Sequence, residues 1–240
     1  MVETAIAQSL DTAVLNRKFA GSGTRAMLSA ILAENRDRKI GLVSSFGAGS
    51  AVLLHLVAGI DRNLPVLFID TGKLFGSTLA FRDRLAGELG LTDVRVIGPE
   101  PVALKRIDPA GALWISDRQA CCDLRKVQPF AEAIADFDIW ISGRKRYQGA
   151  ERSQLELFEA DGPRLKVNPL AHWTSGDLDV YRAAFQLPQH PLVDKGFRSI
   201  GCEPCTTPVR EGEDERAGRW RDIEKTECGI HVPDHMGGLP

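Results

Sequence analysis

The sequence contains no apolar run long enough to cross a bilayer. Its first residues, Met1 to Thr4, lack the basic and apolar stretches of a secretory signal peptide, so we expect the protein to work in the reducing cytoplasm. The charges nearly cancel, because 30 lysines and arginines face 32 aspartates and glutamates and leave a formal net charge of −2. Such a balance does not indicate a nucleic-acid-binding protein. We therefore expect neither a membrane nor a nucleic acid among its partners.

The apolar content predicts a packed core, since 43% of the 240 residues are hydrophobic and 26% are charged. Apolar runs typical of buried strands alternate with segments that have helical spacing. The predicted strands are 40–44, 65–69, 94–97, 139–142 and 165–170, and the predicted helices include 1–22, 24–35, 77–89 and 176–185. This alternation predicts an α/β fold with a doubly wound, mostly parallel sheet. We divide the chain into an N-terminal helical segment (1–38), a nucleotide-binding α/β domain (39–186) and an irregular C-terminal tail (187–240).

Small and polar residues follow the first two strands at their carboxyl ends. The loop Ser45-Phe46-Gly47-Ala48-Gly49-Ser50 lies between a strand and a helix, an arrangement that can hold an anion on free backbone amides. It is not a Walker A loop, because the Gly-Lys-Ser/Thr ending is missing. Asp70-Thr71-Gly72 ends the next strand, where an open parallel sheet binds its ligands. An ordinary strand-to-helix turn is the alternative interpretation of the first loop.

The strand at 139–142 leads into a basic stretch, Gly143-Arg144-Lys145-Arg146. If the anion site exists, these side chains belong above it. The alternative is that they form a solvated run of charges.

Cysteine is scarce, with five in the chain, and four of the five form two pairs: Cys121-Cys122 and Cys202-Glu203-Pro204-Cys205. In a reducing compartment, such pairs are more often metal ligands or redox groups than disulfides. Adjacent cysteines have diverging side chains, which suits two irons of one cluster better than one tetrahedral zinc. The pattern therefore predicts a [4Fe–4S] cluster, with a structural zinc on the same four cysteines as the alternative.

Cys228 is the cysteine left over, and we predict that it is a nucleophile. Nearby cations lower the pKa of a thiol, and His231 and Lys225 lie close to it in sequence, with Arg216 and Arg219 upstream. The alternative is a buried cysteine that acts as a small apolar side chain. If the other four cysteines bind metal, the chain has no thiol to resolve a disulfide on Cys228. We therefore expect an external dithiol partner.

Taken together, these segments resemble the assimilatory adenylyl-sulfate reductases, the iron–sulfur branch of the adenylyl-sulfate and phosphoadenylyl-sulfate reductase family. The resemblance covers about residues 39 to 231. It is carried by the segments Ser44–Ala48, Asp70–Gly72, Cys121–Lys126, Ile200–Thr206, Arg216–Trp220 and Glu227–His231. It implies a fold like the adenine-nucleotide α-hydrolases of PP-loop type and a homo-oligomer. It also implies the reduction of adenylyl sulfate to sulfite and AMP, with thioredoxin as reductant and an S-sulfocysteine intermediate on Cys228.

The resemblance also implies roles for individual residues. Cys228 would be the nucleophile, assisted by Lys126 and His231, and the cluster ligands would be Cys121, Cys122, Cys202 and Cys205. The substrate-binding residues would be Ser45, Phe46, Gly47, Ser50, Asp70, Thr71, Gly72, Arg125, Arg146, Arg216 and Arg219.

The sequence departs from the family pattern at three places. Gly49 stands where relatives usually carry an acidic residue, and the family's basic pair appears as Lys145-Arg146, followed by Tyr147. Phe75-Gly76-Ser77-Thr78 replaces the His-Pro-Glu-Thr that relatives often show. These differences concern the nucleotide contacts and leave the cysteines untouched.

Three other functions are compatible with parts of the pattern. A phosphoadenylyl-sulfate reductase would share the fold but generally lacks the four cluster cysteines. An ATP-dependent adenylating or tRNA-thiolating enzyme would release pyrophosphate. A zinc-stabilised nucleotide-binding regulator would not need Cys228.

Overall fold

The computed structural model describes residues 11–221, 225 and 227–231. Its centre is a six-stranded sheet with the order β3-β2-β1-β4-β6-β5, in which only β5 is antiparallel to its neighbour. The strands are β1 (Ile40–Val43), β2 (Val66–Ile69), β3 (Val94–Ile97), β4 (Ile139–Ser142), β5 (Phe158–Asp161) and β6 (Arg164–Val167). The predicted fold class, a doubly wound and mostly parallel sheet, is confirmed.

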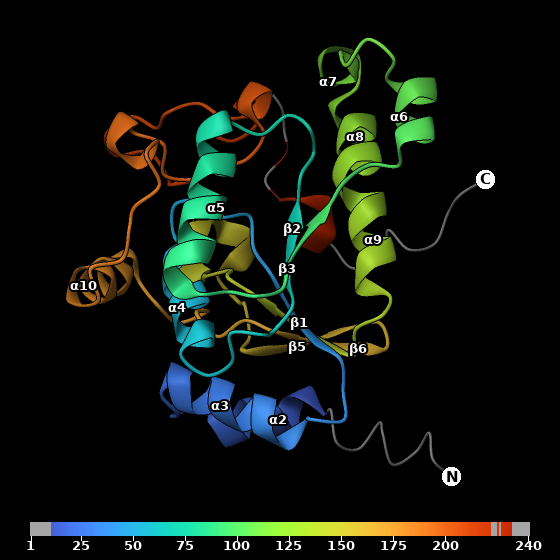
Figure 1. The fold of residues 1–240 in the computed structure, drawn as a ribbon. Coiled ribbons are helices and arrows are strands. Elements are labelled where there is room, and N and C mark those ends of the chain that lie inside the picture. The colour runs from blue at the N-terminus through green and yellow to red at the C-terminus, as the bar shows by residue number, and fades with distance from the viewer. Residues whose placement is uncertain (1–10, 222–224, 226, 232–240) are drawn as a thin grey trace.

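Helices cover both faces of this sheet (Figure 1). The helices are α2 (Thr12–Phe19), α3 (Thr24–Glu34), α4 (Ser50–Ala58), α5 (Gly76–Leu89), α6 (Pro101–Ile107), α7 (Leu113–Ser116), α8 (Arg118–Cys122), α9 (Gln128–Ile134) and α10 (Ser175–Ala184). The larger core lies under α4 and α5, where Val52, Leu54 and Phe81 are buried. A smaller core lies under α9, where Phe130 and Ile134 pack with Trp140. No described helix combines the length and apolar composition that crossing a membrane requires.

The N-terminal helices close one end of the sheet. Leu15 and Phe19 of α2 join the larger core. Asn16 donates a hydrogen bond to the carbonyl of Phe158 (2.9 Å) and accepts one from its N–H (3.0 Å). The amide side chain thereby satisfies backbone groups of the edge strand β5 that would otherwise be open to pairing. Of the helix expected over residues 1–22, Thr12–Phe19 is confirmed, and residues 1–10 lie outside the described part.

A π-helical segment, Asp123–Val127, joins α8 to α9, so that one nearly continuous helical rod runs from Arg118 to Ile134. We call these five residues the π segment. It directly follows Cys121 and Cys122 and carries Lys126. The wider turns of a π helix re-aim the side chains beyond it, and such segments are frequent at functional sites.

After α10 the described chain forms short 3₁₀ turns and isolated bridges. Two bridges attach it to the rest of the molecule and to itself: Leu74 pairs with Cys202, and Thr206 pairs with Arg219. This path brings the Cys202–Cys205 pair next to the loop that follows β2, and it brings other tail residues to the carboxyl ends of β1 and β4.

Candidate active site

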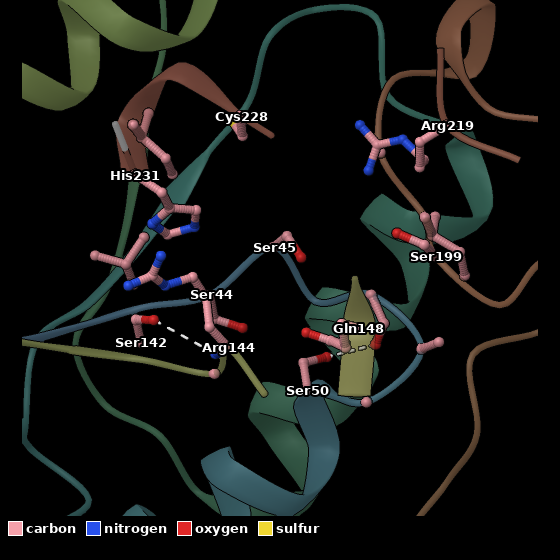
Figure 2. A pocket seen from close by; sticks show the side chains of 18 of the residues that line it. Ser44, Ser45, Ser50, Ser142, Arg144, Gln148, Ser199, Arg219, Cys228 and His231 are labelled. Carbon is pink, nitrogen blue, oxygen red and sulfur yellow. Dashed lines mark hydrogen bonds between the residues drawn. The ribbon is translucent and has the colours of Figure 1, made fainter. Parts of the chain in front are cut away.

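A cavity of about 210 Å³ lies at the carboxyl ends of β1 and β4. We call it the main cavity. Its walls are the loops after these two strands, Lys126 of the π segment, and three pieces of the tail: 198–201, part of 216–220, and most of 227–231. Figure 2 shows side chains from these segments facing a common space, with Cys228 and His231 on one side and Arg219 and Ser199 on the other.

The loop after β1 forms the floor of the main cavity. Phe46 adopts a left-handed backbone conformation (φ 47°), and its fully buried ring packs edge-on against Phe68. Ser45 and Gly47 are thereby left facing the cavity, and Ser50 Oγ donates to the carbonyl of Gly47 (2.7 Å). No side chain caps the N-terminus of α4, which starts at Ser50. The N–H of Ser50 donates to the carbonyl of Gly47 (3.2 Å), and the amides that follow it are available to an anion.

Positive charge dominates the walls. The basic residues that line the main cavity are Lys126, Arg144, Lys145, Arg152, Arg198, Arg216 and Arg219. Among the described residues, no partner hydrogen-bonds three buried nitrogens of the lining, namely Nε of Arg144, Nε of Arg219 and Nδ1 of His231. Buried donors without partners are costly. The lining is therefore suited to a ligand that carries several anionic oxygens.

The thiol of Cys228 lies in this cationic wall, close to Lys126. Lys126 is half-buried, and its pKa is raised above its ordinary value, chiefly because the charge of a Cys228 thiolate would stabilise the ammonium. The chain around Cys228 packs closely against the π segment, since a Cβ on Gly229 would lie only 2.8 Å from Cγ2 of Val127. The nucleophile expected from the sequence therefore lies beside a cationic side chain in the cavity wall.

His231 is held neutral. Its ring stacks on Trp140 with a centroid distance of 5.9 Å and an interplanar angle of 7°. Burial, followed by the charges of Lys166 and Arg144, holds the pKa of His231 well below its ordinary value. A neutral ring does not support the expected role of His231 as a cation beside Cys228. The lysine expected beside it, Lys225, donates to Oε1 of Gln119 at 2.7 Å.

Four cysteines line a second, smaller space of about 20 Å³, which we call the cysteine cavity. They are Cys121, Cys122, Cys202 and Cys205, and all of them are free thiols. Burial, and then the neighbouring Cys122, raise the pKa of Cys121 to about 11. Among the described residues, no group of three or more His, Cys, Asp or Glu side chains is arranged to hold a metal ion.

The chemistry of the cysteine cavity nevertheless fits a sulfur-ligated metal group. Thiolates are the ligands that iron–sulfur clusters and zinc prefer. Cationic side chains that would offset thiolate charge, Arg118, Arg125 and Lys126, line the same space. Lys126 lines both cavities and so separates the four cysteines from Cys228.

The structure brings most of the predicted site residues to these two cavities. Those at the main cavity are Ser45, Gly47, Ser50, Lys126, Arg216, Arg219, Cys228 and His231. Six predicted substrate-binding residues do not line it: Phe46, Asp70, Thr71, Gly72, Arg125 and Arg146.

Several of these six make other contacts. Arg125 forms a buried ion pair with Asp108 (2.6 Å) and donates to the carbonyl of Thr71 (2.8 Å). Oγ1 of Thr71 lies 3.2 Å from Sγ of Cys202. Arg146 donates to the carbonyl of Leu155. Thr71 and Arg125 therefore support the cysteine cavity.

Other residues of the main cavity had not been given individual roles. Arg144 and Lys145 belong to the basic stretch after β4, which was expected to lie above the anion site, and both line the cavity. Arg144 pairs with Glu159 on β5, and burial lowers the pKa of Lys145 to about 8. Arg152 and Glu227 also line the cavity, and nothing in the sequence pattern connects these two residues.

Comparisons with known proteins agree with this geometry. Residues 39–208 match the sequence profile of the phosphoadenosine phosphosulfate reductase domain. The chain is 56% identical over 194 residues to an adenosine 5'-phosphosulfate reductase of Mesorhizobium japonicum, covering 81% of this chain and 76% of that one. It is 52% identical over 205 residues to the protein of that name from Chelativorans, covering 84% of each chain. The fold is similar to that of phosphoadenylyl-sulfate reductase from Candida auris, with a TM-score of 0.71 at 22% identity over 82% of this chain and 96% of that one.

Proposed function

The chain belongs to the phosphoadenosine phosphosulfate reductase family, and we propose that it reduces adenylyl sulfate to sulfite and AMP in the assimilation of sulfate. The observation that carries this proposal is the position of Cys228, beside Lys126 in a cavity lined by cations. Relatives with more than half of their aligned residues identical are named for adenosine 5'-phosphosulfate, which supports this nucleotide over its 3'-phosphorylated form.

In the proposed first step, the main cavity binds the phosphosulfate group and the thiolate of Cys228 attacks its sulfur. A bond forms between Sγ and the sulfate sulfur, the bond from that sulfur to the bridging oxygen breaks, and AMP leaves with the electron pair. The products of this step are AMP and an S-sulfocysteine. Arg216 and Arg219 would offset the repulsion between thiolate and sulfate, and Lys126 and the loop amides would stabilise charge on the leaving phosphate.

In the proposed second step, thioredoxin is the reductant. One of its thiolates attacks Sγ of Cys228, sulfite leaves with the electrons of the sulfur–sulfur bond, and a mixed disulfide remains. The second thioredoxin cysteine attacks that disulfide and restores the Cys228 thiol. Each turnover oxidises one dithiol and reduces one sulfate group to sulfite. The need for an external dithiol follows if the other four cysteines are engaged in the cysteine cavity.

We propose that Cys121, Cys122, Cys202 and Cys205 hold a [4Fe–4S] cluster. The four thiols share one cavity, and the side chains of the adjacent Cys121 and Cys122 suit two irons of one cluster better than one tetrahedral zinc. When bound, the cluster would serve structure and electrostatics. Lys126 lines both cavities, so the charge of the cluster would act on the same ammonium group that lies beside Cys228.

We further propose that Ser45, Gly47, Ser50, Lys126, Arg216 and Arg219 contact the substrate, and that the enzyme works as a homo-oligomer in the cytoplasm. The neutral state of His231 suits a hydrogen-bond donor to a substrate oxygen, because its buried Nδ1 has no partner among the described residues.

The decisive experiment is intact-protein mass spectrometry of anaerobically purified, reduced protein mixed with adenylyl sulfate in the absence of thioredoxin. We expect a single sulfonate, which peptide mapping should locate on Cys228. The control is Cys228→Ser, which should form no adduct and keep the visible absorption of the metal group. Bound nucleotide with no adduct on the wild-type protein would refute the covalent mechanism.

A further inference from the structure

Glu227, the residue before Cys228, is held by donors from three parts of the chain. Nε and Nη2 of Arg152 donate to its two oxygens at 2.6 and 2.8 Å. Nη2 of Arg216 lies 3.3 Å from Oε1, and the backbone N–H of Cys228 donates to the same oxygen at 2.8 Å. One carboxylate therefore connects the loop after β4, the turn at Arg216, and the backbone of the nucleophile.

This ion pair is shielded from solvent. The side chains of Arg152 and Glu227 are 7% and 15% exposed. Burial alone would raise the pKa of Glu227, but the hydrogen bonds and charges of Arg152 and Arg216 hold that pKa at about 2. The carboxylate stays ionised at neutral pH. Paired guanidinium–carboxylate bonds of this kind are among the stronger hydrogen bonds in proteins and fix the geometry of both partners.

The two arginines are not equivalent. Arg152 has each of its three nitrogens engaged, because its Nη1 donates to Oε1 of Gln148 at 2.6 Å in addition to the two bonds to Glu227. Arg216 has other interactions as well, and its contact with Glu227 is longer, at 3.3 Å. Both arginines line the main cavity. An anionic ligand would therefore displace the contact to Arg216 more readily than the two-bond grip of Arg152.

We propose that Glu227 is a positioning residue: through its ion pair with Arg152 it holds residues 227–231, the Cys228 segment, against the main cavity. In the same proposal, Arg216 releases Glu227 and binds the substrate anion instead. The part about the substrate rests on the proposed function. The part about the Cys228 segment does not, because the contacts exist without substrate. Arg152 is then an anchor of the segment, although it lies in the cavity wall.

The first test replaces Glu227 by Gln, which keeps the shape and removes the charge. We expect iodoacetamide to alkylate Cys228 about tenfold faster or more, because one or more charge-assisted bonds are lost. The full chain is used with its metal content intact and without nucleotide, and peptide mapping separates Cys228 from the other thiols. Glu88→Gln is the matched control, because Glu88 pairs with Arg84 at 2.7 Å on an exposed helix face. It should leave the alkylation rate unchanged.

The second test compares Arg152→Lys with Arg216→Lys. Lysine cannot form the two-bond grip, so Arg152→Lys should speed alkylation as Glu227→Gln does. Arg216→Lys should change alkylation by less than about twofold and raise the KM for adenylyl sulfate about tenfold. Glu227→Asp should restore part of the protection that Glu227→Gln loses.

Two results would overturn the proposal. If Glu227→Gln alkylates at the wild-type rate, the carboxylate does not position the segment. If Arg216→Lys exposes Cys228 as much as Arg152→Lys, the two arginines share one role. Failure of the proposed function would be seen separately, as a protein that does not react with adenylyl sulfate although its Cys228 is protected as described.

Discussion

A buried histidine makes the stability of this fold sensitive to mild acid. His190 is fully buried, and its Nδ1 accepts the N–H of Leu192 at 3.2 Å. The proton of the neutral ring must then be on Nε2, which donates to Oγ1 of Thr78 at 3.0 Å. The ring also packs on Phe81. This network joins the start of the tail to α5, next to the main cavity that Thr78 lines.

The size of the effect follows from proton linkage. Burial lowers the pKa of His190 from 6.5 to about 4. The folded state favours the neutral His190 ring, whereas the unfolded chain protonates it below about pH 6.5. The contribution of His190 to the stability of the fold is therefore complete above pH 6.5 and is lost as the pH falls toward and through about 4. Between pH 7 and pH 5, the loss amounts to about 2 kcal/mol in the free energy of unfolding, out of about 3 kcal/mol in all.

The perturbation is His190→Asn, which keeps an acceptor near Nδ1 and removes the titration. We expect the variant to be less stable at pH 7 by about 1–3 kcal/mol, because the bond to Thr78 is lost. Its free energy of unfolding should then fall about 2 kcal/mol less than that of the wild type between pH 7 and pH 5. The measurement is urea unfolding followed by tryptophan fluorescence at matched metal content. The control is His172→Asn: the pKa of the exposed His172 is also lowered, chiefly by partial burial, so this variant should alter the pH dependence in the same direction but by less than His190→Asn.

An equal fall for the wild type and His190→Asn would refute this reasoning. It would mean that His190 can be protonated inside the fold, or that the unfolded chain holds it in a similar environment.

Two further predictions test the supports of the two cavities. Asp108→Asn leaves the buried Arg125 without its 2.6 Å partner and should lower the free energy of unfolding in urea by about 3–5 kcal/mol. The control Glu88→Gln breaks an exposed pair and should lower it by less than about 0.5 kcal/mol. Equal losses would show that the buried pair is unimportant. Gly201→Ala would place a Cβ against the guanidinium of Arg219 and push it from the main cavity. The KM for adenylyl sulfate should then rise about tenfold with little change in melting temperature, and an unchanged KM would remove Arg219 from the substrate-binding residues.

The central parallel strands could be predicted from sequence because they are buried on both faces. Ile40–Val43, Val66–Ile69 and Ile139–Ser142 are apolar runs, and they form strands within a residue or two of the expected bounds. The strand Phe158–Asp161 was not predicted, because it lies at the edge and carries two acidic residues. Its backbone is satisfied in part by Asn16, a partner far away in sequence. Periodicity cannot reveal such a contact.

The candidate site was predictable where its residues form local motifs, as with the two cysteine pairs and the loop after β1. It was not predictable where the backbone decides which way a side chain points. Phe46 lies within the expected anion loop, yet its positive φ turns the ring into the core. Arg152 and Glu227 meet only because the tail folds back over the sheet, and pairs separated by so much chain leave no spacing pattern.

The cysteine cavity also has a consequence for how the protein is made. Its thiols come from two stretches of chain separated by all of β4, β5, β6 and α10. A ribosome that adds about 5–20 residues per second takes roughly 4–16 s to pass from Cys122 to Cys202. Throughout that interval the nascent chain carries only half of the thiols. Loading of the proposed cluster, which needs all four thiols, would have to wait until translation has passed Cys205, so we expect maturation of this site to be a late event in the biogenesis of the protein.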